Sequence, residues 1–427
     1  MCIYQAFFLC YNQYMEREER YILIGVITSD EALVNSSLDE LALLLETAGG
    51  MECGRLTQRL EHPDARSYLG SGKVEELKQE IYIREADAVV CDDELSPVQM
   101  HTLTDELGVK VIDRTVVILD IFAAHAKTKE GKIQVEMAQL KYRASHLSGM
   151  GTALSRQGGG IGTRGPGETK LETDRRAVRN RMGQLSRQIK DMESVRETNR
   201  KKRKQEQIPV IALVGYTNAG KSTLLNALTG SNVLSEDKLF ATLDPTTRSL
   251  ALSDGMQVLL TDTVGFIHKL PHQLIEAFHS TLEEAQYADI ILHVIDASDP
   301  QWEMHNKVVY DTLAGLKIQQ KPVIAVFNKM DEVNEDVILR DLSASRTVRI
   351  SAKSGEGIES LIKGICDTLK DMQKLVKLLI PYSESALAAK IRRIGQIVSE
   401  EYLEEGILLE AYIPRWLSEE YVDKRIP

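Results

Sequence analysis

One segment of the chain carries glycines, a lysine and a serine at a spacing that can bind phosphate. It has the pattern G-x-x-x-x-G-K-S and lies between an apolar run and a helical pattern, which disfavours a plain glycine-rich turn. Glycines let backbone N–H groups face phosphate oxygens, and the start of the next helix adds positive potential. Lys221 can reach the β- and γ-phosphates, and Ser222 can ligate Mg²⁺. The predicted nucleotide-binding loop consists of Gly215, Tyr216, Thr217, Asn218, Ala219, Gly220, Lys221, Ser222 and Thr223.

Three later apolar runs end in polar segments that would complete a guanine-nucleotide site. Asp262 can hold Mg²⁺ through water, and the amide of Gly265 can meet the γ-phosphate. The carboxylate of Asp331 can accept the N1–H and amine protons of guanine, which adenine cannot offer together. A backbone amide in the third segment can meet the guanine O6. The predicted residues of these segments are Asp262, Thr263, Val264, Gly265, Asn328, Lys329, Met330, Asp331, Ser351, Ala352 and Lys353.

The segment between the phosphate loop and Asp262 is the natural place for a switch that senses the γ-phosphate. Its threonines Thr242, Thr246 and Thr247 are all candidates for the residue that senses Mg²⁺, and spacing alone does not choose among them. Phe266 stands where Ras-like GTPases carry a water-orienting glutamine. Phenylalanine cannot orient water, so we expect slow unaided hydrolysis that needs a partner or another group, although Phe266 can also be an ordinary apolar residue. Asn218 is either a K⁺ ligand or a residue that stabilises the loop.

Two stretches of alternating strand and helix patterns must position these residues. Residues 21–113 and 208–371 both alternate short β-rich runs with helical patterns, which predicts parallel sheets with right-handed crossovers. Residues 116–147 are predicted as one long helix, and the charged segment up to 206 as one long helix or a helical hairpin. The fold class is therefore a multidomain α/β protein with a P-loop GTPase domain. The predicted parts are an extension (1–20), an α/β domain (21–114), a helical arm with a glycine-rich loop (115–207), the GTPase domain (208–372) and a small αβ domain (373–427).

Composition excludes several classes of protein. The 427 residues include 52 basic and 63 acidic ones, which gives a net charge of −11 and excludes a free-standing basic DNA coat. No apolar run reaches the length of about 18 residues that predicts a membrane span, and we expect residues 1–14 to lie outside the folded part. A disulfide scaffold and a zinc site built from cysteines are disfavoured, and a reducing cytosol is expected, because the cysteines are few and scattered. These are Cys2, Cys10, Cys53, Cys91 and Cys366.

A basic, glycine-rich region precedes the phosphate loop and suggests an RNA partner. Residues 175–204 contain twelve lysines and arginines and three acidic residues. Such a run is often only a solvated helix, but it follows the glycine-rich stretch 155–165, where Arg156 and Arg164 can pair with phosphate or stack on bases. The alternative for that stretch is a disordered linker. In the first domain, the sequence LGSGKV (69–74) indicates the start of a helix, with ATP binding as the alternative.

Five segments together resemble the HflX family of ribosome-associated GTPases: 134–147, 155–176, 215–222, 240–248 and 262–266. The resemblance implies a cytoplasmic enzyme that hydrolyses GTP to GDP and phosphate with Mg²⁺. It also implies binding to the 50S subunit and the 70S ribosome through ribosomal RNA, with splitting or rescue of stalled ribosomes. It favours Thr242 as the Mg²⁺-linked threonine. By the resemblance, the switch consists of Phe240, Ala241, Thr242, Leu243 and Asp244.

This interpretation assigns catalytic residues and metal ligands, and it leaves several alternative functions open. The catalytic residues are Lys221, Thr242 and Gly265, and the metal ligands are Ser222 and Thr242, with K⁺ as a second candidate ion. We expect a monomer without a membrane anchor. The alternatives are a GTPase in RNA modification or ribosome assembly, a GTPase in membrane traffic, which the lack of a lipidation motif disfavours, and an RNA-binding scaffold in which the nucleotide is structural. Stimulation of hydrolysis by ribosomes would argue against the scaffold.

Overall fold

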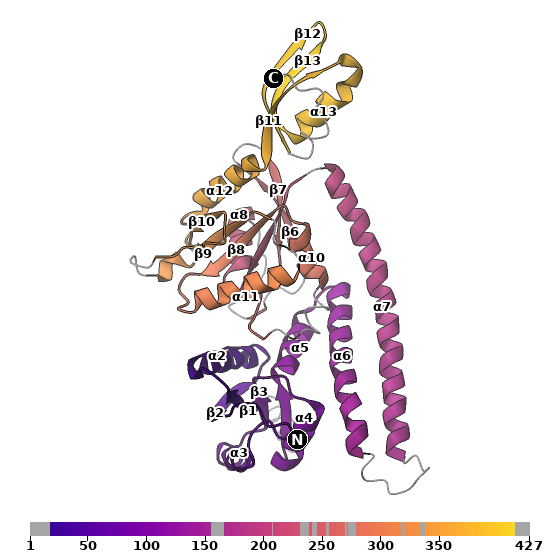
Figure 1. Cartoon of the computed structure of the whole chain (residues 1–427), viewed down its shortest axis with the longest axis vertical. Helices are drawn as coiled ribbons and strands as arrows, with labels where there is room; N and C mark the ends of the chain where they lie inside the picture. The colour runs from indigo at the N-terminus through magenta and orange to yellow at the C-terminus, as the bar shows by residue number, and fades with distance from the viewer. Residues whose placement is uncertain are drawn as a thin grey trace, which may run out of the picture. The chain divides into compact units, whose positions relative to one another are not determined.

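The computed structural model divides the chain into two compact units (Figure 1). The first comprises Met1–Ser194 with the short segments Glu236–Asp244 and Ile267–Ser280, and the second comprises the remainder. Residues 1–14, which we expect outside the folded part, and the glycine-rich stretch 155–165 lie outside the described residues, and the bounds of the five predicted parts remain predictions. The described residues are 18–154, 166–206, 208–230, 239–240, 246–252, 256–269, 271, 279–316, 318, 321–333 and 338–414.

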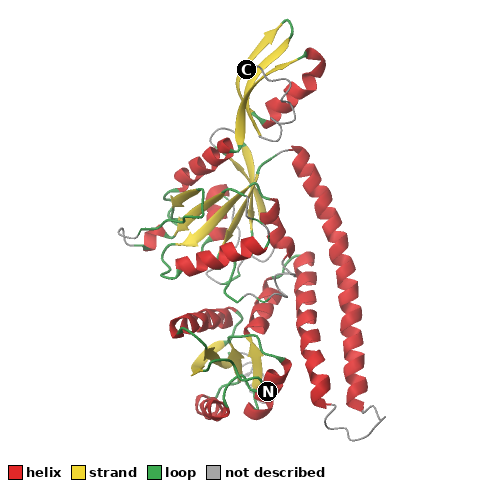
Figure 2. Ribbon diagram, viewed as in Figure 1, coloured by secondary structure: helices red, strands yellow, loops and turns green. Residues whose placement is uncertain are grey.

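The first unit contains a parallel sheet of four strands in the order β2-β1-β3-β4, as the alternating pattern predicts. Side chains of α3 and α4 pack on one face in a core with Ile22, Ile24 and Val89. Helices α2 and α5 contact each other and lie on the other face (Figure 2). Because both faces are covered, the strands can be apolar throughout. The elements are β1 (Arg20–Ile27), α2 (Glu31–Thr47), β2 (Met51–Arg59), α3 (Ser71–Arg84), β3 (Ala88–Cys91), α4 (Pro97–Leu107), β4 (Lys110–Asp113) and α5 (Arg114–His125).

Two helical segments differ from the sequence-based expectation. The sequence pattern of residues 38–50 predicts a helix that glycines end. The helix begins earlier, at Glu31, because the Asp30 side chain accepts a hydrogen bond from the Ala32 amide at 2.9 Å and caps the helix. The single helix expected over 116–147 is wrong. The chain becomes extended at Ala126, and α6 (Lys129–Leu154) starts anew. The Thr128 hydroxyl accepts from the Gly131 amide at 2.9 Å and satisfies the first turn of α6.

The segment 69–74 starts a helix, which confirms that interpretation. Gly70 precedes α3 in an extended conformation, and its amide donates to the Gln58 side chain at 2.8 Å. Lys73 forms an ion pair with Glu76 at 2.9 Å, one turn further along the helix. ATP binding at this segment stays an untested alternative.

Helices α6 and α7 (Pro166–Glu206) run antiparallel to each other (Figure 1). α7 is one continuous helix, so this segment is a single long helix and not a helical hairpin. Its half-buried and buried residues fall at spacings of three and four, and Leu185 at their centre packs against Ile133 and Met137 of α6. The pair is also joined by Arg181, whose guanidinium contacts the Glu136 carboxylate at 2.6 and 2.8 Å.

The second unit contains a six-stranded sheet in the order β10-β9-β8-β5-β7-β6. Every neighbouring pair is parallel except β6 and β7, so the predicted parallel α/β domain is confirmed. Its core joins apolar residues of the strands to those of α8 and α12. The elements are β5 (Val210–Gly215), α8 (Lys221–Thr229), β6 (Thr246–Ala251), β7 (Gln257–Asp262), α10 (His279–Tyr287), β8 (Ile290–Asp296), α11 (Trp302–Gly315), β9 (Val323–Asn328), η2 (Met330–Glu332), β10 (Arg346–Arg349) and α12 (Ile358–Asp371).

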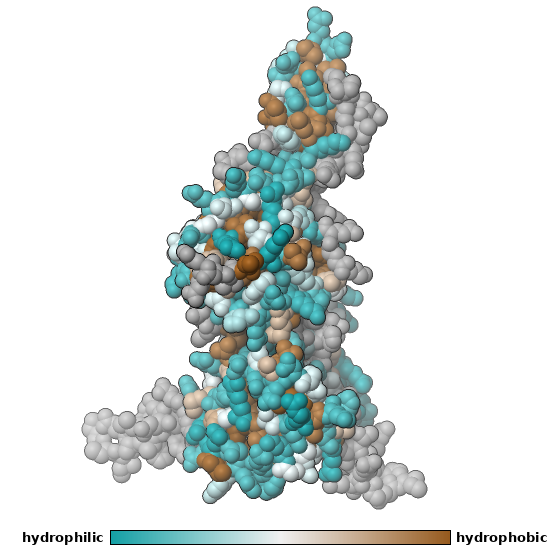
Figure 3. Space-filling view, turned by 60° about the vertical axis from the view of Figure 1, so that its left-hand side comes forward, coloured by the Kyte–Doolittle hydropathy of each residue, from teal (hydrophilic) through white to brown (hydrophobic). Residues whose placement is uncertain are grey.

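The last part of the described chain is a small αβ structure. Three antiparallel strands in the order β11-β13-β12 cover α13 and share a core with it. Hydrophobic side chains are also exposed over this part (Figure 3), among them Leu375, Val398 and Tyr402. Within the described ranges, no helix is both long enough and apolar enough to cross a membrane. The elements are β11 (Gln373–Ile380), η3 (Tyr382–Glu384), α13 (Ser385–Ile394), β12 (Gln396–Leu403) and β13 (Gly406–Pro414).

Candidate nucleotide-binding site

The six-stranded sheet brings most of the predicted site segments to one edge. β5 ends at Gly215, β7 ends at Asp262 and β9 ends at Asn328, while Ser351 follows β10. Carboxyl ends of parallel strands share an edge, which is where sheets of this kind bind ligands. Because β5 lies between β7 and β8, the phosphate loop has Asp262 on one side and the guanine-recognition segments on the other.

Two glycines of the phosphate loop are required by close contacts. A Cβ atom at Gly215 would lie 2.2 Å from the carbonyl oxygen of Val294 in β8. Gly220 has a φ of +88°, and a Cβ atom there would lie 2.3 Å from Nδ2 of Asn328. Any side chain would therefore displace the loop from the neighbouring strand ends. α8 begins directly afterwards at Lys221, so its N-terminal amides add to the anion-binding character of the loop.

Lys221 is buried inside the loop. Its ammonium donates hydrogen bonds to the carbonyl oxygens of Gly215 at 3.1 Å and Tyr216 at 2.8 Å. Burial lowers the pKa of Lys221 to about 8, although the Asp262 carboxylate opposes this shift. Neutral acceptors solvate the charge only in part. A phosphate group beside this lysine would favour the charged ammonium, so the site is suited to an anion.

The residues expected to hold Mg²⁺ lie next to each other. The Ser222 hydroxyl donates to Oδ2 of Asp262 at 2.8 Å, and the Asp262 side chain is fully buried. An oxygen-only pair of this kind, which leaves further positions to phosphate and water, suits Mg²⁺. The Ser222 and Asp262 oxygens fit a metal held jointly with a nucleotide. Within the described ranges, no group of three or more His, Cys, Asp or Glu residues could hold a metal ion.

Gly265 lies close to the phosphate loop. A Cβ atom at Gly265 would lie 2.8 Å from Cγ2 of Thr217 and 3.0 Å from Nζ of Lys221. The next residue joins the two segments, because the Phe266 amide donates to Gly215 at 3.1 Å and its carbonyl accepts from Thr217 at 2.8 Å. The Phe266 side chain is 2% exposed, which supports its interpretation as an apolar packing residue.

Asn328 connects the phosphate loop to the segment expected to recognise guanine. Its Nδ2 donates to the Ala219 carbonyl and its Oδ1 accepts from the Ala352 amide, both at 2.9 Å. The side chain of Asp331 is exposed, and a hydrogen bond from Ser351 lowers its pKa below the usual value. An ionised carboxylate only accepts hydrogen bonds, as the donor edge of guanine requires.

The sequence analysis missed two contacts at this edge. Lys329, which has a φ of +63°, forms an ion pair with Asp296 at 2.6 Å, and Asp296 ends β8. The Tyr216 ring stacks on His305 with 3.8 Å between ring centroids, and His305 contacts the Asp299 carboxylate at 2.8 Å. A strand ending in an aspartate was a usable signal for Asp296. The stacking depends on an α11 residue far away in the sequence, so no local pattern indicated it.

The remaining predicted residues of the same edge have supporting positions. Thr263 is buried and donates to the Leu213 carbonyl at 2.7 Å, and Val264 is buried beside it. Thr223 lies in the first turn of α8, Met330 packs against apolar residues next to β9, and Lys353 is exposed. Asn218 is exposed with a φ of +61°, a conformation that asparagine tolerates. This suits a loop-stabilising residue, and K⁺ binding stays a prediction.

Four of the predicted switch residues, Ala241, Thr242, Leu243 and Asp244, lie outside the described residues. The first switch residue, Phe240, is buried, and its ring packs against Phe122 of α5 at 4.6 Å between centroids. Phe240 is thus not among the residues gathered at the six-stranded sheet. The two rival threonines, Thr246 and Thr247, lie in β6, where the hydroxyls of Thr247 and Thr261 are 3.0 Å apart.

Three family models match consecutive parts of the chain. The model described as GTP-binding GTPase N-terminal matches residues 35–123, and the model described as GTP-binding GTPase Middle Region matches residues 125–203. The model described as 50S ribosome-binding GTPase matches residues 210–329. The third match covers the phosphate loop and extends to Lys329.

Curated relatives match almost the whole chain. GTPase HflX of Lacrimispora saccharolytica is 54% identical over 93% of this chain and 94% of its own length. GTPase HflX of Caldanaerobacter subterraneus is 48% identical over 95% of this chain and 93% of its own. GTPase HflX of Escherichia coli is 39% identical over 95% of both. With these matches and a phosphate loop built as described, the chain belongs to the HflX family of GTPases.

Proposed function

We propose that this GTPase uses its nucleotide state to control binding to the 50S ribosomal subunit and the 70S ribosome. It acts in the cytoplasm as a monomer and splits or rescues stalled ribosomes. The observation that carries this proposal is the exposed basic side of α7. The match to a family model described as 50S ribosome-binding GTPase supports it. Family membership as a GTPase argues against the scaffold alternative, in which the nucleotide is only structural.

Within this proposal, the phosphate-loop lysine neutralises the β- and γ-phosphates, and the Gly265 amide senses the γ-phosphate. Ser222 and Thr242 would hold Mg²⁺, with Asp262 bound to it through water. The bound Mg²⁺ supplies charge neutralisation at the phosphates. Asp331 accepts the guanine donors. Hydrolysis without the ribosome is slow, because the buried Phe266 provides no group that orients water.

Two groups can be distinguished among the described basic residues of α7. Arg175 and Arg181 serve the helix pair, since Arg175 donates to the Leu147 carbonyl at 2.7 Å and Arg181 is paired with Glu136. The other group is exposed, and guanidinium and ammonium groups of this kind suit phosphates of RNA. Its members are Arg176, Arg179, Arg187 and Lys190.

The triple variant Arg176→Gln/Arg179→Gln/Arg187→Gln tests the proposal. We expect about tenfold or greater loss of 50S affinity at moderate salt, and a shallower dependence of affinity on salt, because fewer counterions are released. Intrinsic GTP hydrolysis should be unchanged, since the substituted residues all precede the phosphate loop. Co-sedimentation with 50S and 70S particles, in GDP and in a non-hydrolysable GTP analogue, measures the affinity.

The matched control is Lys363→Gln/Lys370→Gln/Lys374→Gln, which removes three exposed charges elsewhere. Equal ribosome affinity of both triple variants would refute the role of α7. If the intact protein binds 50S particles but ribosomes neither stimulate its hydrolysis nor are split, a role in ribosome assembly replaces the splitting proposal.

A further inference from the structure

The aromatic ring of Tyr216 in the phosphate loop is held by a histidine from outside the loop. The rings of Tyr216 and His305 stack with 3.8 Å between their centroids and an angle of 13° between their planes. Tyr216 comes directly after β5, whereas His305 lies in the first turn of α11. Both residues belong to the same compact unit. Because the rings are close and nearly parallel, the contact fixes the direction in which the Tyr216 side chain leaves the loop.

Helix α11 gives His305 a firm support. Val309 and Leu313 follow it at intervals of four residues, so they lie on the same face of the helix. They are 0% and 3% exposed, and α11 contacts the strands β5 and β8. A helix that is anchored in the core along this face cannot follow the movement of one loop residue. The stack therefore holds the loop against the helix.

The imidazole of His305 is oriented by Asp299. Its Nδ1 lies 2.8 Å from Oδ2 of Asp299, and Oδ1 of Asp299 accepts from the Gln301 amide, also at 2.8 Å. Burial would raise the pKa of Asp299, but the hydrogen bonds from His305 and from the Gln301 amide outweigh it and lower the pKa. An ionised carboxylate only accepts hydrogen bonds, so Nδ1 carries a proton. The imidazole cannot turn over without losing this bond.

The backbone of Tyr216 contacts the lysine that we expect to meet the phosphates. Its carbonyl accepts from Nζ of Lys221 at 2.8 Å and from the Ala219 amide at 3.3 Å. The two hydrogen bonds between the loop and Phe266 use the residues on either side of Tyr216, so they do not hold this carbonyl directly. The ring and the carbonyl belong to the same residue. A shift of the ring would therefore displace the acceptor of the lysine.

We propose that His305 is a positioning residue for GTP hydrolysis, which holds the Tyr216 ring and thereby keeps the Tyr216 carbonyl where it orients the Lys221 ammonium. Asp299 supports this role by fixing the imidazole. Both residues act through Tyr216 and not on the nucleotide. This inference rests on the proposed contact between Lys221 and the phosphates. A purely structural role of His305 would instead lower the melting temperature and leave hydrolysis at saturating GTP unchanged.

The test compares His305→Gln with His305→Phe in the full-length protein. Glutamine can still donate to Asp299 but has no ring, whereas phenylalanine can stack on Tyr216 but cannot bond to Asp299. We expect His305→Gln to lower the single-turnover rate at saturating GTP about fivefold, because loss of the stack leaves the lysine misplaced. His305→Phe should keep most of the rate. The reverse order of the two variants would overturn the inference.

A double variant tests whether His305 acts through the tyrosine ring. Tyr216→Leu alone should slow hydrolysis by a similar factor, and the addition of His305→Gln should slow it no further, because both changes remove the same stack. Losses that multiply in the double variant would show that His305 acts by another route and would refute the proposal. If Tyr216→Leu does not fold, the comparison of the two His305 variants still decides, because the His305 side chain is 18% exposed.

His101→Gln is the matched control, because His101 also pairs with an aspartate, Asp105, at 2.9 Å, but in the other compact unit. Its hydrolysis rate should equal that of the parent protein, and a loss as large as that of His305→Gln would count against a specific role. Thermal unfolding of His305→Gln is measured as well, and a lower melting temperature with a normal rate would contradict the proposal. Lys221→Met distinguishes the failures. If it hydrolyses GTP normally, the proposed phosphate contact is wrong. If it is slow while His305→Gln is normal, only the positioning inference fails.

Discussion

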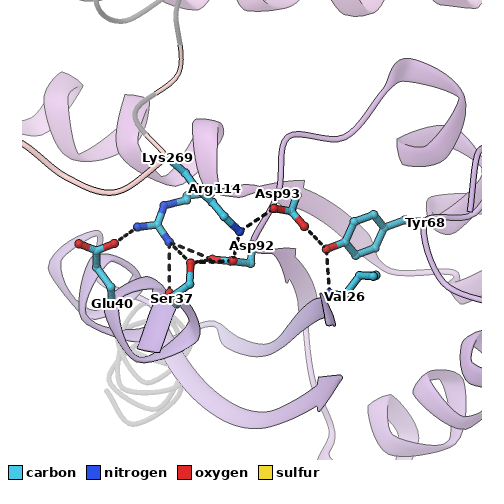
Figure 4. A network of polar contacts seen from close by, with 8 residues as sticks. All are labelled: Val26, Ser37, Glu40, Tyr68, Asp92, Asp93, Arg114 and Lys269. Carbon is cyan, nitrogen blue, oxygen red and sulfur yellow. Dashed lines mark hydrogen bonds and ion pairs between the residues drawn. The ribbon is translucent and has the colours of Figure 1, made fainter. Parts of the chain in front are cut away.

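Both α/β sheets of this protein carry polar residues at their carboxyl edges, but these residues are paired differently in the two sheets. In the first sheet, Asp92 is buried and satisfied by Ser37, Arg114 and Lys269 (Figure 4). In the second sheet, Asp331 is exposed and a serine hydroxyl lowers its pKa. Both carboxylates accept from a serine. Only Asp331 has acceptor capacity left for a ligand.

The lysines of the two edges differ in the same way. Lys269 faces two carboxylates, which raise its pKa, whereas Lys221 donates to carbonyl oxygens and burial lowers its pKa to about 8. A charge that is paired with opposite charges inside the protein stabilises the fold. A charge that has only neutral hydrogen-bond acceptors beside it can still pair with a charged ligand. The comparison explains why we assign the nucleotide to the edge of the second sheet and a structural role to the buried acids of the first.

The largest expected effect is on GTP affinity, and it distinguishes Asp331 from Asp92. Asp331→Asn places an amide donor opposite the guanine donors, so GTP affinity should fall on the order of 10⁴-fold, with a gain for the xanthine nucleotide. The melting temperature should not change, because Asp331 is exposed. Titration with labelled GTP and XTP measures both affinities. Glu332→Gln, the adjacent exposed acid, is the control, and unchanged GTP affinity in Asp331→Asn would remove base recognition from this residue.

A smaller effect is expected from the phosphate-loop lysine. Lys221→Met keeps the length of the side chain but removes its charge, so kcat for GTP should fall about 10²–10³-fold. The melting temperature at pH 7 should not fall, because a buried lysine with a lowered pKa destabilises the fold while it is charged. Calorimetry of the variant measures this, and a clear loss of stability would contradict it.

The same lysine predicts a dependence on pH. In the folded protein its pKa is about 8, against an ordinary value of 10.5. The unfolded chain binds more protons between these values, so the contribution of Lys221 makes the protein more stable as the pH rises through that window. GTP affinity should weaken over the same range, since phosphate binds the protonated form. Lys221→Met should lack both trends.

The smallest of these effects concerns stability alone. Arg114→Met leaves the buried Asp92 and the half-buried Glu40 without their shared cation, which should lower the free energy of unfolding by about 3 kcal/mol. GDP affinity should remain unchanged, since the side chain of Arg114 pairs with Ser37, Glu40 and Asp92 and, among the described residues, with none of those assigned to the nucleotide. Denaturant unfolding with GDP titration distinguishes the two outcomes. A variant that is as stable as the parent protein would show that the network does not support the first sheet.

Much of the fold followed from local patterns. The α/β character of both sheets was predicted because buried parallel strands are short apolar runs between helical patterns, whereas β6 and β8 were not predicted as separate strands. The start of α2 at Glu31 was missed because one capping aspartate outweighed weak periodicity. The break at Ala126 was missed because that stretch contains neither proline nor a clear stop. Local capping bonds of Asp30 and Thr128 decided both boundaries.

The sequence by itself determined the chemistry of the proposed nucleotide site, because its glycines, Lys221, Ser222, Asp262 and Asp331 occur at spacings that suit phosphate and guanine. The sequence could not predict which charged residues, far apart along the chain, form ion pairs. Lys329 with Asp296, and Lys269 with the two aspartates after β3, are joined only by tertiary structure. Charged residues follow no local periodicity that reveals their partners. Which charges form a pair depends on the strand ends and loops that lie within a few ångströms of each other once the cores have packed.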